Sequence, residues 1–282
     1  MEEKKLPAEY IRQPYPITAF QADLSIRQIR ILAAMMKGIQ DGVRKMFKQK
    51  AETRQVELFP DLDAGYIYIC VPFREVTDRS DTYVDVERVA RKFMDMVFRY
   101  DDKQKGEITL THFVDEISIP KPNGRRETIR FKFSQQQANV IFNFTMYSRY
   151  LMPVVMSAKS KYTARIYMLM TSAQGFKEKN SSTYSWYVGY DELRRIFGCD
   201  VKQPNGRWCR KTRKDYRHFK LDVLQVAQNE LKKLADEGIS DCWFDYKESP
   251  EDYIKEPKSL VFTIHLVEEE KALLNSNIIK KW

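Results

Sequence analysis

The chain has 282 residues, of which 43% are hydrophobic and 31% charged, and its formal net charge is +9. This length favours about two domains, and the composition is too apolar for a disordered protein. No run approaches the roughly 18 consecutive apolar residues of a membrane span, and the first ten residues are charged where a signal peptide is apolar. We therefore expect a cytoplasmic protein.

The positive charge is concentrated in one segment. Residues 202–220 contain eight Lys and Arg against one Asp, whereas residues 1–150 contain 25 Lys and Arg against 21 Asp and Glu. A local excess of this kind suits a polyanionic partner such as nucleic acid.

The predicted elements begin after an N-terminal segment with little periodicity. Residues 1–22 contain three prolines and are predicted to form an extended arm. Apolar residues at helical spacing predict a helix over residues 24–39. The sequence then turns polar, and residues 40–65 are predicted to form a connecting excursion.

The next elements of the first half follow the order of a winged helix. We predict a strand at 66–71, a short helix at 73–77, a turn at 78–81, a longer helix at 82–99, and strands at 107–119 and 127–133. The Asn123-Gly124 pair between the last two strands is a strong hairpin signal. In a winged helix the second helix of the helix-turn-helix enters the major groove, and the hairpin wing contacts the backbone or minor groove.

The same order recurs in the second half. We predict a helix at 159–173, a strand at 184–188, a short helix at 190–197, a basic turn, a long helix at 215–236, and strands at 242–246 and 259–267. The expected fold is therefore α+β, a tandem pair of winged-helix domains. Its expected parts are an arm at 1–22, a first domain at 23–150, a second domain at 158–268 and a tail at 269–282.

The basic segment leads into the predicted helix at 215–236, which makes it the main candidate site. The apolar stripe of that helix consists of Phe219, Val223, Val226, Ala227, Leu231 and Leu234. Cationic side chains at a helix N-terminus can reach phosphates and guanine edges. The candidate DNA-binding residues are Arg207, Arg210, Lys211, Arg213, Lys214, Arg217, His218 and Lys220. A solvated charged surface is the ordinary alternative, and the helix-turn-helix context favours DNA.

We expect Arg213, Arg217 and Lys220 to lie on the DNA face, because they precede or flank the apolar stripe. A parallel candidate site in the first domain consists of Arg79, Ser80, Thr82, Tyr83, Arg88 and Arg91, with Lys121, Asn123, Arg125 and Arg126 from the wing. That region is more acidic, so DNA contact and a solvated charged surface are equally open there.

The sequence contains no clear motif for a catalytic, metal or cofactor site. The three histidines are isolated, no His-x-His pair exists, and the four cysteines form no C-x-x-C pair. No G-x-x-x-x-G-K-[ST] loop is present. The neighbouring pairs Asp101-Asp102 and Asp115-Glu116 do not converge on one side of a strand. We expect no enzyme, no metal site and no cofactor.

Two stretches of the second half resemble a known family. These stretches are residues 184–197 and the helical pattern made by Tyr216, Phe219, Lys220, Val223, Leu224, Ala227 and Glu230. They are similar to the second winged helix of iteron-binding plasmid replication initiators. The resemblance extends from Leu24 to Val267, and it is weaker in the first half, where the excursion is long.

The resemblance implies a bacterial protein that binds tandem double-stranded DNA repeats at a plasmid origin and helps to open the duplex. It also implies a dimer that represses its own gene, a first domain that serves in dimerisation and accessory DNA contact, and contacts with the host helicase, its loader and the host initiator. Two other interpretations are a winged-helix transcriptional regulator without a replication role and an enzyme acting on nucleic acid. Direct repeats near the gene would favour an initiator, and one palindrome at a promoter would favour a regulator.

Overall fold

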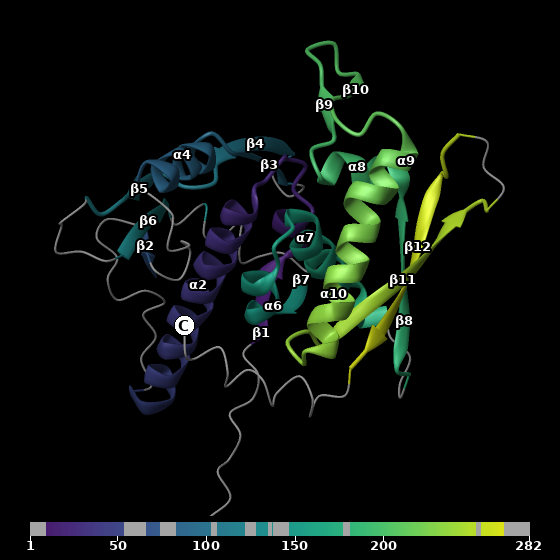
Figure 1. The fold of residues 1–282 in the computed structure, drawn as a ribbon. Coiled ribbons are helices and arrows are strands. Elements are labelled where there is room, and N and C mark those ends of the chain that lie inside the picture. The colour runs from purple at the N-terminus through teal and green to yellow at the C-terminus, as the bar shows by residue number, and fades with distance from the viewer. Residues whose placement is uncertain are drawn as a thin grey trace, which may run out of the picture. The chain divides into compact units, whose positions relative to one another are not determined.

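The structure is a computed structural model that divides into two compact units (Figure 1). The residues it describes are 10–53, 66–73, 83–102, 106–121, 128–134, 137, 147–176, 181–251 and 255–267. The discontinuous unit combines Met1–Ile29 with Met146–Trp282, and the inserted unit is Arg30–Thr145. None of the helices within the described ranges is long and apolar enough to cross a membrane.

The inserted unit is built from helices and antiparallel strands. Its elements are α2 (Ile26–Thr53), which begins just before the division, β2 (Tyr66–Pro72), α4 (Tyr83–Met94), β3 (Val97–Asp102), β4 (Glu107–His112), β5 (Glu116–Ser118) and β6 (Thr128–Ser134). The strands form a three-stranded sheet in the order β2-β6-β5 and a separate β3-β4 pair. The predicted strand over 107–119 is therefore two strands in different sheets.

An aromatic cluster forms the core of the inserted unit. Strand β6 alternates strictly between buried and half-buried residues, which places Phe131 and Phe133 on its inner face. The ring of Phe113 lies 6.2 Å from that of Phe93 on α4 and 5.8 Å from that of Phe133. Helix α2 approaches β2 closely, since a Cβ atom on Gly38 would lie 2.8 Å from Ile69 Cγ2.

Two helix boundaries in this unit differ from the prediction. Helix α2 continues to Thr53, so residues 40–53 of the predicted excursion are helical and the rest of it lies outside the described residues. A polar stretch of good helix formers can extend a helix without an apolar stripe. The helix predicted over 82–99 ends at Met94, because strand β3 begins at Val97 and pairs with β4.

The discontinuous unit contains the remaining elements. They are β1 (Tyr10–Pro14), α1 (Tyr15–Thr18), β7 (Tyr147–Leu151), α6 (Met152–Ser157), α7 (Lys161–Met170), η1 (Thr171–Phe176), β8 (Thr183–Gly189), α8 (Tyr190–Ile196), β9 (Asp200–Lys202), β10 (Trp208–Arg210), α9 (Tyr216–Phe219), η2 (Lys220–Gln225), α10 (Val226–Asp236), β11 (Cys242–Ser249) and β12 (Ser259–Leu266). The α+β class predicted from the sequence is confirmed.

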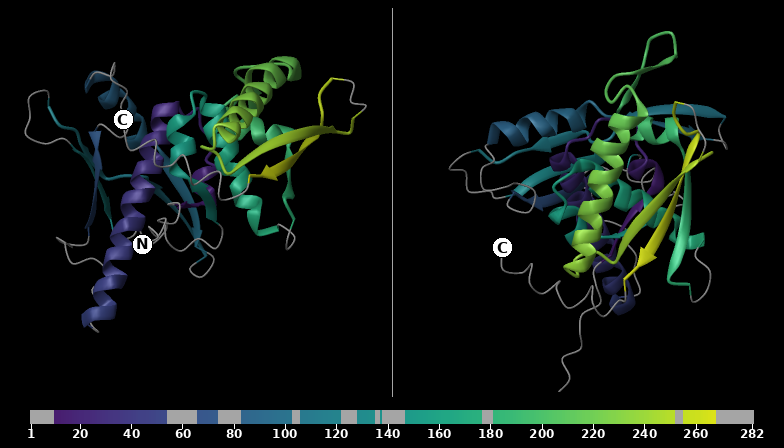
Figure 2. Two further views of the ribbon diagram at one scale, coloured as in Figure 1. Left: turned by 60° about the horizontal axis from the view of Figure 1, so that its bottom comes forward. Right: turned by 45° about the vertical axis from the view of Figure 1, so that its right-hand side comes forward.

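A three-stranded antiparallel sheet in the order β11-β12-β8 supports the helices of this unit. Its buried face carries alternating residues such as Trp186, Phe244 and Phe262. The ring of Phe262 lies 4.8 Å from that of Trp186 and 5.2 Å from that of Phe244. Helix α10 packs against β11 and α7, and the views in Figures 1 and 2 show it lying beside the sheet. The elements predicted over 159–267 are all present.

The first described residues belong to the discontinuous unit and do not form a separate arm. Strand β1 pairs with β7 over five residues, from Tyr10 opposite Leu151 to Pro14 opposite Tyr147. The prediction of an arm over 1–22 is therefore corrected for residues 10–18, which form β1 and α1. Pairing with a strand that begins more than 130 residues later leaves no local pattern in the sequence.

A buried arginine fastens the segment that follows α1. The guanidinium of Arg165 on α7 donates to the carbonyls of Thr18, Phe20, Ala22 and Ile196 over distances of 2.5 to 3.3 Å. Burial lowers the pKa of Arg165 to about 10, so the group stays charged at neutral pH. Backbone carbonyls thus replace water around the cation and hold the connection into α2.

Candidate nucleic-acid interface

The predicted recognition helix is one continuous helical segment made of α9, η2 and α10. Its N-cap is Asp215, whose carboxylate accepts from the backbone N–H of His218 at 2.9 Å. Tyr216, Phe219 and Leu231 are buried on its inner side. Residues 220–225 form the π-helical turn η2, and the predicted stripe residues Ala227, Leu231 and Leu234 after it are buried as expected. Val226 is the exception, since it is 41% exposed.

A short hairpin precedes this helix, within the segment predicted to be a basic turn. Strands β9 and β10 pair from Asp200 opposite Arg210 to Lys202 opposite Trp208. The tip is closed by a bond from Gln203 N to the Arg207 carbonyl, at 2.8 Å. In Figures 1 and 2 the hairpin projects beyond the ends of α8 and α9. Sequence reasoning missed it because its strands are only three residues long, too short for an alternating pattern to be recognised.

The hairpin and the start of the helix carry exposed cations. Their side chains form no ion pair with any carboxylate that the structure describes. The members of this set, which we call the cationic surface, are Lys202, Arg207, Lys211, Lys214 and Arg217. Four of them were predicted as site residues, and Lys202 was not named individually.

Three other predicted cations are held by carboxylates. Arg210 pairs with Glu256, Arg213 Nε lies 3.5 Å from Asp222, and Lys220 Nζ lies 2.7 Å from Glu248. Of the three residues expected on the DNA face, Arg217 is exposed, while Arg213 is mostly covered by its position over the Tyr162 ring and Lys220 is half-buried. Their contact with DNA stays a prediction.

His218 is exposed, and its ring is already engaged. Its Nδ1 lies 2.8 Å from both carboxylate oxygens of Asp215. The backbone and side-chain hydrogen bonds from His218 lower the pKa of Asp215. The same carboxylate therefore caps the helix and orients the imidazole at its exposed end.

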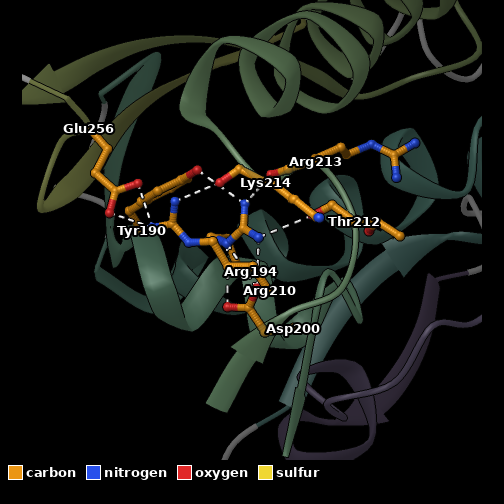
Figure 3. A network of polar contacts seen from close by, with 8 residues as sticks. All are labelled: Tyr190, Arg194, Asp200, Arg210, Thr212, Arg213, Lys214 and Glu256. Atoms are coloured by element: carbon orange, nitrogen blue, oxygen red, sulfur yellow. Dashed lines mark hydrogen bonds and ion pairs between the residues drawn. The ribbon is translucent and has the colours of Figure 1, made fainter.

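A buried polar network lies beneath the cationic surface. Figure 3 shows Arg194 of α8 at its centre, with Asp200 of β9, Tyr190 of α8 and the backbone of Thr212 and Arg213 around it. Both charged side chains are almost inaccessible, 0% exposed for Arg194 and 7% for Asp200. Nothing in the sequence distinguishes Arg194 from the half-buried Arg195 that follows it on the same helix, so the prediction missed it.

The predicted site in the inserted unit is only partly described. Arg88 pairs with Asp85 at 2.6 Å and Arg91 with Glu87 at 2.5 Å, each on the same helix. Lys121 is exposed, and Tyr83 begins α4. Arg79, Ser80, Thr82, Asn123, Arg125 and Arg126 lie outside the described residues. Arg88 and Arg91 of α4 are therefore balanced by carboxylates within one turn, whereas the exposed Lys92 of the same helix forms no ion pair with a described carboxylate.

The histidines and cysteines have structural surroundings. His112 Nδ1 lies 2.9 Å from the Met94 carbonyl, and the ring of His265 stacks on Trp243 at 4.1 Å. Burial raises the pKa of the Cys199 and Cys242 thiols, which disfavours the reactive thiolate. Among the described residues no group of three or more His, Cys, Asp or Glu side chains is placed to hold a metal ion.

Comparison with known proteins relates the chain to a family and to solved structures. Residues 10–171 match the family model described as "Initiator Replication protein, WH1". The structure is similar to the "Crystal structure of Pi initiator protein in complex with iteron DNA", with a TM-score of 0.62 and 16% identity, over 93% of this chain and 99% of that chain. No curated protein matches the sequence. The predicted winged-helix fold is confirmed by these two likenesses.

Proposed function

The chain belongs to the family of initiator replication proteins, and we propose that it starts plasmid replication by binding repeated double-stranded DNA sites, or iterons, at an origin and promoting opening of the duplex. The family match extends over more than half of the chain, from residue 10 to residue 171. The solved Pi initiator, which has the same fold, is bound to iteron DNA. Binding of this chain to such repeats is the inference that we draw from both.

The observation that carries the proposal is the cationic surface. Five exposed cations on the hairpin and at the helix start have no described ion-pair partner, whereas Arg88 and Arg91 of α4 do. Unpaired cations gain by displacing the counterions around DNA phosphates, which makes them the natural contacts for a duplex. A charged surface that only faces solvent would not require some cations to be ion-paired and others to be left without a described carboxylate partner.

The positions of these side chains suggest that they contact different parts of the duplex. Arg217 and His218 lie in the first turn of the helix, where side chains can reach base edges in the major groove. Lys211 and Lys214 precede the helix and are placed for phosphates. Arg207 at the hairpin tip extends the surface along the duplex axis, toward the neighbouring backbone or minor groove.

A titration against the DNA upstream of the chain's own gene tests the proposal. Four phosphate contacts, or five if Arg217 also meets a phosphate, would give a slope of about −4 to −5 for log K against log salt concentration, from about −0.9 per contact. A duplex of scrambled sequence should bind more weakly, and protection should fall on direct repeats. Protection of one palindrome at the promoter without protection of any direct repeat would instead favour the transcriptional regulator, and equal affinity for both duplexes would contradict iteron recognition.

Several finer expectations stay predictions of the family resemblance. They are self-association into a dimer that represses its own gene, a role of the first predicted domain, residues 23–150, in dimerisation and accessory DNA contact, and contacts with the host helicase, its loader and the host initiator. A footprint on the chain's own promoter that depends on protein concentration would support the repressor dimer.

A further inference from the structure

The guanidinium of Arg194 uses all five of its N–H donors inside the protein (Figure 3). Nε and Nη2 donate to Asp200 Oδ1 at 3.0 and 2.7 Å, and Nη1 donates to the Tyr190 hydroxyl at 3.2 Å. The remaining hydrogens reach the carbonyls of Thr212, at 3.1 Å, and Arg213, at 2.7 Å. Because this side chain is 0% exposed, it does not itself contact DNA.

These acceptors come from both sides of the hairpin. Asp200 begins β9, while Thr212 and Arg213 follow β10 on the way to the helix. The Cys199 carbonyl also accepts from the N–H groups of Lys211, at 2.8 Å, and Thr212, at 3.0 Å. The chain entering the hairpin and the chain leaving it are thus joined at one point, directly below the cationic surface.

The exit from the hairpin adopts a backbone conformation that needs support. Arg213 has a φ of +46°, in the left-handed region that residues with a side chain rarely adopt. Such a conformation costs of order 1 kcal/mol or more and persists where surrounding contacts hold it. The bond from Arg194 Nη1 to the Arg213 carbonyl is a contact of this kind.

Arg194 also lies against the inner side of the recognition helix. Its guanidinium carbon is 5.8 Å from the centre of the Phe219 ring and 5.5 Å from that of Tyr190. The Tyr190 ring meets Tyr216 and Phe219 edge to face, at 5.3 and 5.2 Å. One buried cation therefore touches α8, both ends of the hairpin and the first turn of the helix.

We propose that Arg194 is a positioning residue for DNA binding, which fixes the β9-β10 hairpin and the first turn of the helix as one rigid surface. Lys202 and Arg207 can then engage the same duplex as Arg217 without a loss of loop entropy on binding. This inference rests on the proposed function. Lysine cannot replace Arg194, because an ammonium has three donors on one nitrogen and lacks the planar fork that the five acceptor contacts require.

The Arg194→Lys variant tests the inference, with Tyr167→Phe as a matched control. Tyr167 is a second buried group of the same unit, bonded to Asp241 and to the Leu151 N–H, away from the hairpin. In the free protein, amides of residues 199–214 should exchange roughly tenfold faster or more in Arg194→Lys, since losing charge-assisted hydrogen bonds has an effect of this size. Amides of β11 and β12 should keep their wild-type rates.

Binding of both variants to the labelled upstream duplex supplies the second measurement. Arg194→Lys should bind roughly tenfold more weakly, and its salt slope should be smaller by about two, from loss of the two hairpin contacts. Tyr167→Phe should lower stability and leave the slope unchanged. If Arg194→Lys does not fold, Asp200→Asn, which keeps the size of the side chain, takes its place with the same expected results.

The outcomes separate the inference from the proposed function. A wild-type protein without preference for its upstream duplex contradicts the function. Wild-type preference together with unchanged exchange at residues 199–214, or with unchanged affinity and salt slope in Arg194→Lys, overturns the role of Arg194. Faster exchange throughout the unit, equal to that in Tyr167→Phe, would also overturn it by assigning Arg194 a general structural role.

Discussion

Alanine substitutions at Arg217 and Lys220 distinguish an exposed cation from one that a carboxylate already holds. Arg217 is exposed without a described ion-pair partner, whereas Lys220 Nζ lies 2.7 Å from Glu248. We expect Arg217→Ala to weaken binding to the upstream duplex by about 1 to 3 kcal/mol if the side chain reads a base, and less if it contacts a phosphate. Lys220→Ala should weaken binding by less than about 1 kcal/mol, because its charge is already offset.

Lys220→Ala should lower the free energy of unfolding more than Arg217→Ala does. The Lys220 and Glu248 side chains are 36% and 19% exposed, so their ion pair is partly screened and contributes about 1 kcal/mol at most. Lys220→Ala removes that contribution and a link between the helix and β11. Arg217→Ala changes an exposed helix position, where substitutions usually alter the free energy of unfolding by less than about 0.5 kcal/mol.

Fluorescence anisotropy over a series of salt concentrations measures binding, and urea unfolding measures stability. Lys233→Ala is the control, because Lys233 is 71% exposed on the same helix but lies in its last turn, 3.7 Å from Glu237. It should bind like wild type. If Lys220→Ala binds as poorly as Arg217→Ala and is as stable as wild type, Lys220 contacts DNA and our division of paired and unpaired cations is wrong.

Three further predictions concern the support of this surface. Arg165→Met should lower the free energy of unfolding by about 3 kcal/mol or more, because buried carbonyls lose their donor; an unchanged urea midpoint would contradict the role of Arg165. Asp215→Ala should lower the melting temperature measured by circular dichroism, through loss of the N-cap. Burial raises the pKa of Glu248, but hydrogen bonds from Lys220 and Tyr216 outweigh it and leave the pKa lowered. The contribution of the Glu248 carboxylate to stability is therefore fully present above pH 4.5, the pKa of the unfolded state, and is lost as the pH falls through the lower pKa of the folded state. Wild type and Glu248→Gln should therefore differ in the free energy of unfolding near neutral pH and converge at about pH 3.

Local patterns in the sequence were sufficient for most of the discontinuous unit. Helical spacing predicted the helix over 215–236, and alternation predicted β8, β11 and β12, because burial on one side imposes those periods. Val226 is the exception, since it is 41% exposed while Ala227, Leu231 and Leu234 are buried. It directly precedes Ala227 and lies at the edge of the buried side of the helix, where periodicity alone does not decide burial.

Contacts between distant residues could not be predicted. The bonds of Arg165 to Thr18, Phe20 and Ala22 join residues 143 to 147 positions apart, and strand β1 pairs with β7 across a similar separation. The sequence therefore suggested an arm where the structure has a strand and a helical turn. Glu230 is a related case: its place in the family pattern was noted, but only the structure shows that it accepts from the N–H groups of Lys159 and Ser160 at the start of α7.

The division of the cations was equally hidden, because it depends on which carboxylates fold back onto them. Within the basic segment, Arg210 and Lys220 find Glu256 and Glu248, which lie 46 and 28 residues further along the chain. Arg194 and Arg195 are neighbours on one short helix, but only Arg194 lies at the centre of the polar network. Charge density predicted a candidate interface, but not which of its side chains are held by carboxylates.

The two buried arginines act on the same short helix and thereby connect the N-terminal segment with the cationic surface. Arg165 binds the carbonyl of Ile196, the last residue of α8, and Arg194 lies one half-turn before it. Gly198 follows with a φ of +66°, and a Cβ atom there would lie 2.3 Å from Asp23 N, so the segment before α2 presses against the base of the hairpin. Any side chain at Gly198 would force these two backbones apart. Residues 10–25 therefore support the proposed DNA-binding surface, although none of them belongs to it. Their removal should weaken DNA binding by that surface.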